Sequence, residues 1–237
     1  MALSRTALER ATWPEVAAAS PAVVLVPVGS CEQHGPHLPF DTDTRIAVAV
    51  ATRVAEARSD VLVAPALAYG SSGEHQAFAG TLSIGTEALV HVLVELGRSA
   101  FPEGRWPHRS LVFVNGHGGN TAAVRTAVET LVGEGRPVEA WWPSFDADDA
   151  HAGRTETSLL LAIAPGVVGE DRPVGATEPL AELIVPMRAG GVAAVSANGV
   201  LGDATGASAA LGAAILDEMV RELDTVIAAN IAGTHDL

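Results

Sequence analysis

The chain has 237 residues, of which 48% are hydrophobic and 4% aromatic, and its formal net charge at pH 7 is −14. This length is enough to bury a substantial core. The acidic charge excludes nucleic acid and anionic membranes as partners, because both require a basic surface. The single cysteine, Cys31, excludes an intrachain disulfide and predicts a cytoplasmic protein. Residues 1–15 lack the apolar segment of a secretory signal, and no stretch approaches the roughly 20 apolar residues that span a bilayer.

Continuous apolar runs predict four strands that are covered on both faces: residues 22–28, 61–67, 110–115 and 138–142. Helical stripes alternate with them: Ile46, Val50 and Val54; Leu89, Leu93, Leu96 and Ala100; Ala123, Val124, Ala127, Val128 and Leu131; and Leu211, Ile215, Met219 and Leu223. This alternation predicts an α/β fold: a single domain, residues 1–237, with three α/β/α layers and a mostly parallel sheet. Residues 171–207 are expected to form long loops with one or two strands.

Ionisable side chains follow three of the predicted strands. Glu32 and His34 come after the first strand, Glu74 and His75 after the second, and His117 after the third. In open α/β sheets, ligands bind beyond the carboxyl ends of the strands, so these side chains are expected at one rim. Carboxylates and imidazoles are typical ligands of hydrolytic metal sites.

The segment that carries Glu32 and His34 is the most informative part of the chain. In an extended segment, residues two apart point to the same side, so both can reach one metal cluster while Cys31 and Gln33 point away. His37 and Asp41 follow in the same polar stretch. Asp43 opens a predicted helix, and Asp is a common N-cap residue. Taken alone, Asp43 is better explained as an N-cap than as a metal ligand.

The Gly-rich turn at residues 115–120 contains His117. One interpretation is an anion-binding nest at a helix N-terminus. The turn lacks the spacing of a dinucleotide-binding or P-loop fingerprint, and no Lys follows it. A metal-ligand role for His117 is therefore favoured over nucleotide binding.

The segment 151–158 precedes an apolar run and reads as a helix start. Thr155 or Thr157 could cap this helix, and Glu156 could complement its positive end, but neither role explains His151. The upstream acidic residues Asp146, Asp148 and Asp149 are expected in a solvated loop. Glu74, His75, Trp141 and Trp142 are candidate substrate contacts. One of the two tryptophans is expected in the core, because alternation sends them to opposite faces.

In this order the motifs resemble the creatininase (creatinine amidohydrolase) family of metal-dependent hydrolases over essentially the whole chain. The similarity is carried by residues 27–39 with Asp43, by residues 115–120 and 151–158, and by the loop 199–203. The resemblance implies an α/β/α fold, two divalent metal ions per subunit (Zn or Fe(II), with Mn as a further option) and a homo-oligomer, a hexamer or similar.

The resemblance also implies roles for individual residues. The metal ligands would be Glu32, His34, Asp43 and His117. Asp43 takes the bridging place. In creatininase itself a ligand glutamate stands where this chain has Gly119, and Glu156 is the carboxylate best placed to replace it. The expected catalytic residues are Glu156 and His151, with His151 giving a proton to the departing amine.

Within the family, the chain is most similar to the creatininase-like peptidases of mycofactocin systems. This implies a binuclear metal-dependent amidohydrolase that cleaves a modified precursor peptide and releases its C-terminal, dipeptide-derived core. The alternative is a creatinine amidohydrolase or formamide deformylase acting on a small cyclic amide or formamide. A non-catalytic metal-binding scaffold is disfavoured, because every residue type that catalysis needs is present.

Overall fold

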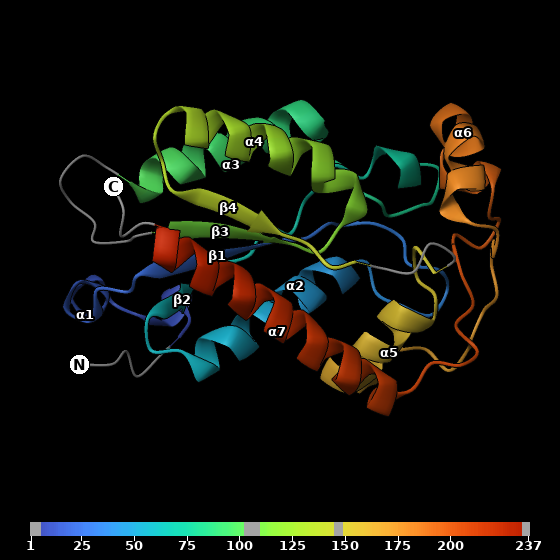
Figure 1. The fold of residues 1–237 in the computed structure, drawn as a ribbon. Helices are drawn as coiled ribbons and strands as arrows, with labels where there is room; N and C mark the ends of the chain where they lie inside the picture. Colours follow the sequence, from blue (N-terminus) through green and yellow to red (C-terminus); the bar gives the residue numbers. More distant parts are fainter. Residues whose placement is uncertain (1–5, 102–109, 145–148, 234–237) are drawn as a thin grey trace.

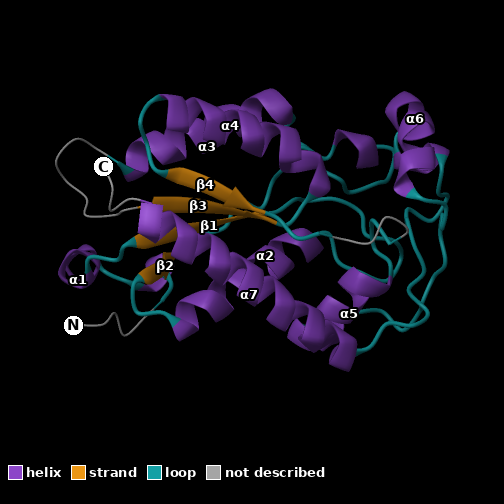
Figure 2. Cartoon of the chain, in the orientation of Figure 1, coloured by secondary structure: helices purple, strands orange, loops and turns teal. Residues whose placement is uncertain are grey.

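The computed structural model describes residues 6–101, 110–144 and 149–233. At its centre lies a four-stranded sheet with the strand order β2-β1-β3-β4, in which every strand pair is parallel (Figure 1, Figure 2). The strands are β1 (Val23–Val28), β2 (Val61–Val63), β3 (Ser110–Asn115) and β4 (Val138–Trp141). The four predicted strands and their parallel arrangement are thus confirmed.

Helices cover both faces of the sheet. α3 (Thr86–Ala100) and α4 (Thr121–Gly133) lie on one face, and α2 (Thr42–Ala57), α5 (Arg154–Ile163) and α7 (Ala209–Gly233) lie on the other (Figure 1). α1 (Trp13–Ala19) precedes β1, and α6 (Leu180–Gly190) stands beyond the carboxyl ends of the strands. Short 3-10 helices are η1 (Leu8–Arg10), η2 (Gly73–His75), η3 (Gly118–Asn120), η4 (Pro165–Val167) and η5 (Val192–Ala194). The predicted three-layer α/β/α fold is confirmed.

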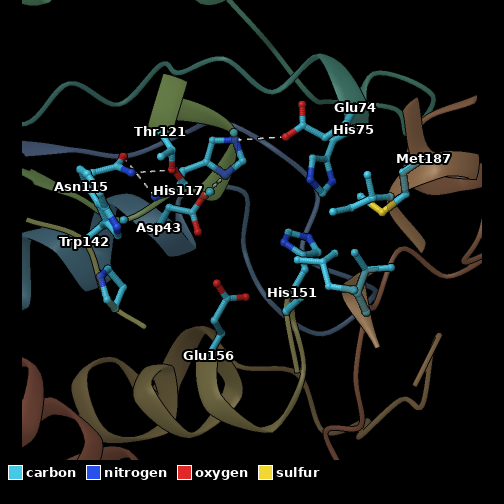
Figure 3. A pocket seen from close by; sticks show the side chains of 18 of the residues that line it. Asp43, Glu74, His75, Asn115, His117, Thr121, Trp142, His151, Glu156 and Met187 are labelled. Carbon is cyan, nitrogen blue, oxygen red and sulfur yellow. Dashed lines mark hydrogen bonds and ion pairs between the residues drawn. The ribbon is translucent and has the colours of Figure 1, made fainter. Parts of the chain in front are cut away.

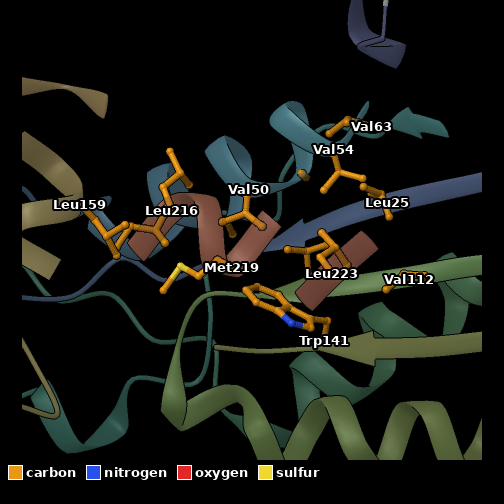
Figure 4. Close-up of a cluster of buried hydrophobic side chains, with 14 of the residues drawn as sticks. Leu25, Val50, Val54, Val63, Val112, Trp141, Leu159, Leu216, Met219 and Leu223 are labelled. Atoms are coloured by element: carbon orange, nitrogen blue, oxygen red, sulfur yellow. The ribbon is translucent and has the colours of Figure 1, made fainter. Parts of the chain in front are cut away.

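Alternate strand residues enter two separate cores. Leu25 and Val112 point into the layer of α2, α5 and α7, where Met219 and Leu223 belong to the same cluster (Figure 4). Phe113 points to the opposite face, into the cluster under α3 and α4. Full burial of one such side chain contributes about 1.5–3 kcal/mol. The two cores therefore fix the positions of the strand ends, from which the polar loops emerge.

Two strands end earlier than predicted. β2 stops at Val63, and Leu67 forms only an isolated bridge with Val28. Pro65 lies between them, and proline has no N–H for a ladder hydrogen bond. β4 ends at Trp141, one residue before the predicted limit. The chain thus leaves the sheet early and enters the loops that carry the polar residues.

The expectation of loops and strands for residues 171–207 was wrong in part. This region contains the helix α6 and isolated bridges instead of regular strands. A helical stripe was visible in the sequence: Leu180, Leu183, Ile184 and Met187. Pro186 inside the helix and the glycines that follow it hide this signal, because proline normally breaks helices. No helix in the described ranges is both long and apolar enough to cross a membrane.

Candidate metal centre

The loop after β1 brings Glu32 and His34 into one buried cluster. Both side chains are completely buried, and each offers an atom that lies close to the same neighbours. Nδ1 of His34 is 3.1 Å from the backbone oxygen of Glu32. Because a carbonyl can only accept, Nδ1 carries a hydrogen, and Nε2 is the ring nitrogen that remains to bind a cation once it loses its own proton. Glu32 and His34 thus contribute to one set of ligand atoms, as their two-residue spacing predicted.

Asp43 lies in the first turn of α2 and contacts groups from two loops, the one after β1 and the one after β3. Its Oδ1 is 2.9 Å from Nε2 of His34, and its Oδ2 is 3.3 Å from Nδ1 of His117. Ser30 Oγ donates a hydrogen bond of 2.6 Å to Oδ2. The N-cap interpretation of Asp43 was wrong: Asp41 occupies the cap position and makes no side-chain cap bond. The Asp43 carboxylate instead faces both histidines, and Figure 3 shows it beside His117.

β3 and the Gly-rich turn position His117. The ring nitrogen Nε2 lies 3.0 Å from Glu32 Oε2, and the ring is almost fully buried. The side chain of Asn120 fixes the turn by accepting from Ser71 N at 2.8 Å and donating to Gly29 O at 3.0 Å. The loops after β1, β2 and β3 are therefore tied together by one amide.

α5 and the loop before it carry His151 and Glu156. Asp149 accepts from the backbone N–H groups of Arg154 and Thr155, both at 2.8 Å, and so caps the helix. The expected threonine cap was wrong, and so was the solvated position of Asp149, which is buried. Asp146 and Asp148 lie outside the described residues. Glu156 Oε2 accepts from the Ala152 N–H at 2.6 Å.

Three overlapping sets of ligand atoms result among the described residues. They are Glu32–Asp43–His117, His34–Asp43–Glu156 and Glu32–His34–His151, and within each set the atoms lie within 4.8 Å of one another. Asp43 belongs to the first two sets, so its carboxylate stands between them. The structure thus brings together every residue that the sequence analysis singled out as a ligand, and His151 with them.

Glu156 does not lie where a side chain at position 119 would. Its Oε2 is 3.8 Å from His34 Nε2, on the side of the cluster away from the Gly-rich turn. A Cβ at Gly119 would lie 2.4 Å from both His117 Nε2 and Glu74 Oε1, so the backbone leaves no room for one. Glu74 therefore occupies the space beside His117, and Glu156 serves the other half of the cluster.

The chemistry of the cluster fits a bound cation. Neither oxygen of Glu32 has a hydrogen-bond partner, although the carboxylate is completely buried. Burial of an ionised carboxylate without compensation is costly, whereas coordination of a cation satisfies it. Oxygen and nitrogen ligands without thiolate suit zinc, iron(II) or manganese.

The charges in the cluster are strongly coupled. Burial alone would lower the pKa of His34 and of His117, but the neighbouring carboxylates Asp43 and Glu32 outweigh it and raise each pKa to about 10. Burial raises the pKa of Glu156 to about 7. Burial also lowers the pKa of His151 well below its usual value, and that of His75 to about 4. Without a cation, protons on His34 and His117 balance the carboxylates.

A pocket of about 740 Å³ opens onto this cluster. Glu74 and His75 both line it, as expected for candidate substrate contacts (Figure 3). Of the two tryptophans, Trp141 is buried in the core beside α7, while Trp142 lines the pocket. α6 forms a further wall of the pocket, in which Figure 3 shows Met187 on the side away from Asp43 and Glu156; the α6 residues that line the pocket are Leu180, Ile184, Met187 and Arg188. This wall was missed in the sequence because α6 itself was missed.

The comparison with known proteins agrees with this geometry. The chain matches the creatininase (creatinine amidohydrolase) family over residues 9–227. It is 59% identical over 205 residues to the mycofactocin precursor peptide peptidase of Mycolicibacterium smegmatis, covering 84% of this chain and 81% of that protein. It is 33% identical to the creatinine amidohydrolase of Pseudomonas putida, covering 69% of this chain and 74% of that protein.

Solved creatininase structures share the fold. A manganese form of creatininase gives a TM-score of 0.73 at 27% identity and covers 94% of this chain and 98% of that chain. A zinc–zinc form of a glutamate-to-glutamine variant gives 0.73 at 27% identity, with coverages of 94% and 97%. The sequence match extends over nearly the whole chain, and the solved structures reproduce its layers. The chain belongs to the creatininase family.

Proposed function

We propose that this protein is a binuclear metal-dependent peptidase that cleaves a modified precursor peptide in mycofactocin biosynthesis. The cleavage would release the C-terminal, dipeptide-derived core of the peptide. The observation that carries the proposal is the sharing of Asp43 between two sets of ligand atoms at the end of a large pocket. The choice of substrate is supported by relatives that are more than half identical to this chain over the aligned residues and are named mycofactocin precursor peptide peptidase.

Two divalent ions would be held by separate sets of residues. Glu32, Asp43 and His117 would hold one ion, and His34, Asp43 and Glu156 the other. Zinc, iron(II) or manganese suits these ligands. The ions would supply Lewis-acid chemistry, which polarises an amide carbonyl and makes water more acidic.

The remaining pocket residues act on the substrate and its proton. Burial keeps the His151 imidazole neutral, so it can take a proton and pass it to the departing amine nitrogen. The apolar wall of α6, with Ile184 and Met187, lines the same pocket as the polar cluster. If the scissile amide of the substrate stands next to a bulky apolar group, that group would pack on the α6 wall. The amide carbonyl would then lie at the cluster.

The size of the pocket favours the peptide over the alternative substrates. A volume of about 740 Å³ is far more than a small cyclic amide or a formamide fills. The proposal also takes the enzyme to be a single-domain, cytoplasmic homo-oligomer, hexameric or similar. The unpaired Cys31 fits a reducing compartment.

A substrate panel tests the function. Metal-replete protein is incubated in parallel with the modified precursor peptide, creatinine and a formamide, and the products are followed by mass spectrometry. The expected result is one cleavage near the C-terminus of the peptide and no change in the two small compounds. Turnover of creatinine or the formamide with an intact peptide would contradict the proposal.

A pair of variants separates metal binding from proton transfer. Asp43→Ala should lose bound metal and all activity, because its carboxylate belongs to both ligand sets. His151→Ala should keep the metal and lower kcat by about 100- to 10,000-fold, the usual contribution of a general acid or base. Metal content is measured by elemental analysis of the purified variants.

The exposed His91 on α3 provides the control, since His91→Ala should change neither quantity. If the metal content and kcat of His151→Ala fell together, His151 would be a metal ligand instead. It would then act through the set that it forms with Glu32 and His34.

Metal binding should release protons. Because the pKa values of His34 and His117 are raised to about 10 without a cation, both are protonated at neutral pH and must lose that proton to bind metal. We expect release of about two protons per subunit near pH 8 and weaker binding as the pH falls. Glu156, with a pKa of about 7, adds to this loss below neutrality. Titration calorimetry in buffers of different ionisation enthalpy measures the release; binding that is independent of pH would refute this charge assignment.

A further inference from the structure

Gln33 is a buried glutamine that the proposed chemistry does not use. It lies between Glu32 and His34 in the chain, and its side chain contacts two further histidines. These are His75, with Nδ1 at 2.9 Å from Gln33 Nε2, and His151, with Nε2 at 3.1 Å from the same atom. A donor that sits between two imidazoles can decide which nitrogen of each ring carries the hydrogen.

The orientation of the Gln33 amide follows from its backbone partners. Gly35 N–H donates to Gln33 Oε1 at 2.8 Å, and Gln33 Nε2 donates to Gly199 O at 3.0 Å. If the amide oxygen and nitrogen of Gln33 exchanged places, the nitrogen would face the N–H of Gly35 and the oxygen would face the carbonyl of Gly199. Neither contact could then be a hydrogen bond. Gly199, at φ +79°, packs so closely that a Cβ there would lie 2.0 Å from Gln33 Oε1. The amide is thus held in one orientation, with one remaining hydrogen on Nε2.

His151 cannot accept that hydrogen. Its Nε2 lies 2.8 Å from the backbone oxygen of Gln33, and a carbonyl oxygen only accepts, so Nε2 of His151 is the protonated nitrogen. Nδ1 of His151 is left bare, at 3.7 Å from Glu32 Oε1, in a ring that lines the pocket.

His75 therefore receives the remaining hydrogen of Gln33. Its Nδ1 is the acceptor, and the hydrogen of its neutral ring sits on Nε2. That nitrogen lies 3.4 Å from Oε1 of Glu32, the carboxylate without a hydrogen-bond partner. This protonated nitrogen thus faces a candidate metal ligand without an aligned hydrogen bond in this structure, and outer contacts of this kind tune the ligands of metal sites.

We propose that Gln33 is a positioning residue that sets the tautomers of both histidines. Its backbone oxygen leaves Nδ1 of His151 free toward the pocket, and its side-chain amide turns the Nε2 hydrogen of His75 toward Glu32. The role of His151 in proton transfer rests on the proposed function. In that step a proton leaves the attacking water for Nδ1 as the carbon–oxygen bond forms. It then passes from Nδ1 to the amine nitrogen as the carbon–nitrogen bond breaks, while the hydrogen on Nε2 stays bonded to that nitrogen and is donated to the Gln33 backbone oxygen.

The tautomers can be read directly by NMR of protein labelled with ¹⁵N-histidine, because protonated and bare ring nitrogens differ strongly in chemical shift. In the metal-free wild type we expect His75 and His151 both to carry their hydrogen on Nε2, with signals assigned by their loss in H75N and H151N. A hydrogen on Nδ1 of either ring would overturn the proposal without bearing on whether the peptide is cleaved.

Gln33→Met separates the two contacts of Gln33, because methionine keeps the shape of the side chain and the backbone oxygen but removes the donor. We expect His75 to lose its fixed tautomer and His151 to keep its own. Metal affinity, measured by competition with a chromophoric chelator, should fall about 10- to 100-fold, as is usual when a partner of a metal ligand is lost.

Gln76→Met, at an exposed position beside η2, is the matched control and should behave as the wild type. An unchanged His75 tautomer in a folded Gln33→Met protein would contradict the proposal. If Gln33→Met does not fold, the wild-type spectrum alone decides the question.

Discussion

A buried carboxylate that forms no hydrogen bond is the constraint on which this structure depends. Glu32 is completely buried beyond the end of β1, and neither of its oxygens is satisfied by a hydrogen bond. Such a charge is costly in a folded protein unless positive charge compensates it, either from protonated imidazoles or from a bound cation. The imidazoles of His75, His117 and His151 approach Glu32 from three other segments, at 3.0 to 3.7 Å. They meet at Glu32 because the loops after consecutive parallel strands open at the same rim.

The topology explains how segments far apart in the sequence reach this point. β1 and β3 are neighbours in the sheet, and the loops that follow them carry Glu32 and His117. α2 begins directly behind these loops, so Asp43 in its first turn faces both histidines of the cluster. The side chain of Asn120 joins the loops after β1, β2 and β3. The cores on both sides of the sheet hold the strand ends, and the site inherits their rigidity.

Much of this arrangement was predictable from periodicity and from the placement of polar residues after strands. The continuous Val- and Leu-rich runs predicted the sheet, and its parallel order predicted one shared rim. What failed was local: Asp43 suggested an N-cap, because a helix start and a ligand position have the same sequence signature. Asp149 looked like part of a solvated acidic loop, since its capping of α5 depends on a chain reversal that no short pattern encodes. α6 was hidden by Pro186, although its apolar stripe was present.

The partners of individual side chains could not be predicted at all. Nothing in the sequence indicates that Glu156 approaches His34 instead of His117. Glu156 and His34 lie more than a hundred residues apart in the chain, so no local pattern links them. The same holds for the contacts of Gln33 with His75 and Gly199, which arise only when three loops pack together. Spacing within a motif reports which residues share a face, and tertiary packing decides what that face meets.

Two divalent cations would be held around Asp43, one by each of the two ligand sets to which it belongs. Anomalous diffraction from crystals of metal-loaded protein tests this arrangement most directly. We expect two peaks on either side of Asp43, one beside Glu32 and His117 and the other beside His34 and Glu156. A lone peak away from Asp43, or ligand atoms beyond bonding distance of any peak, would contradict it.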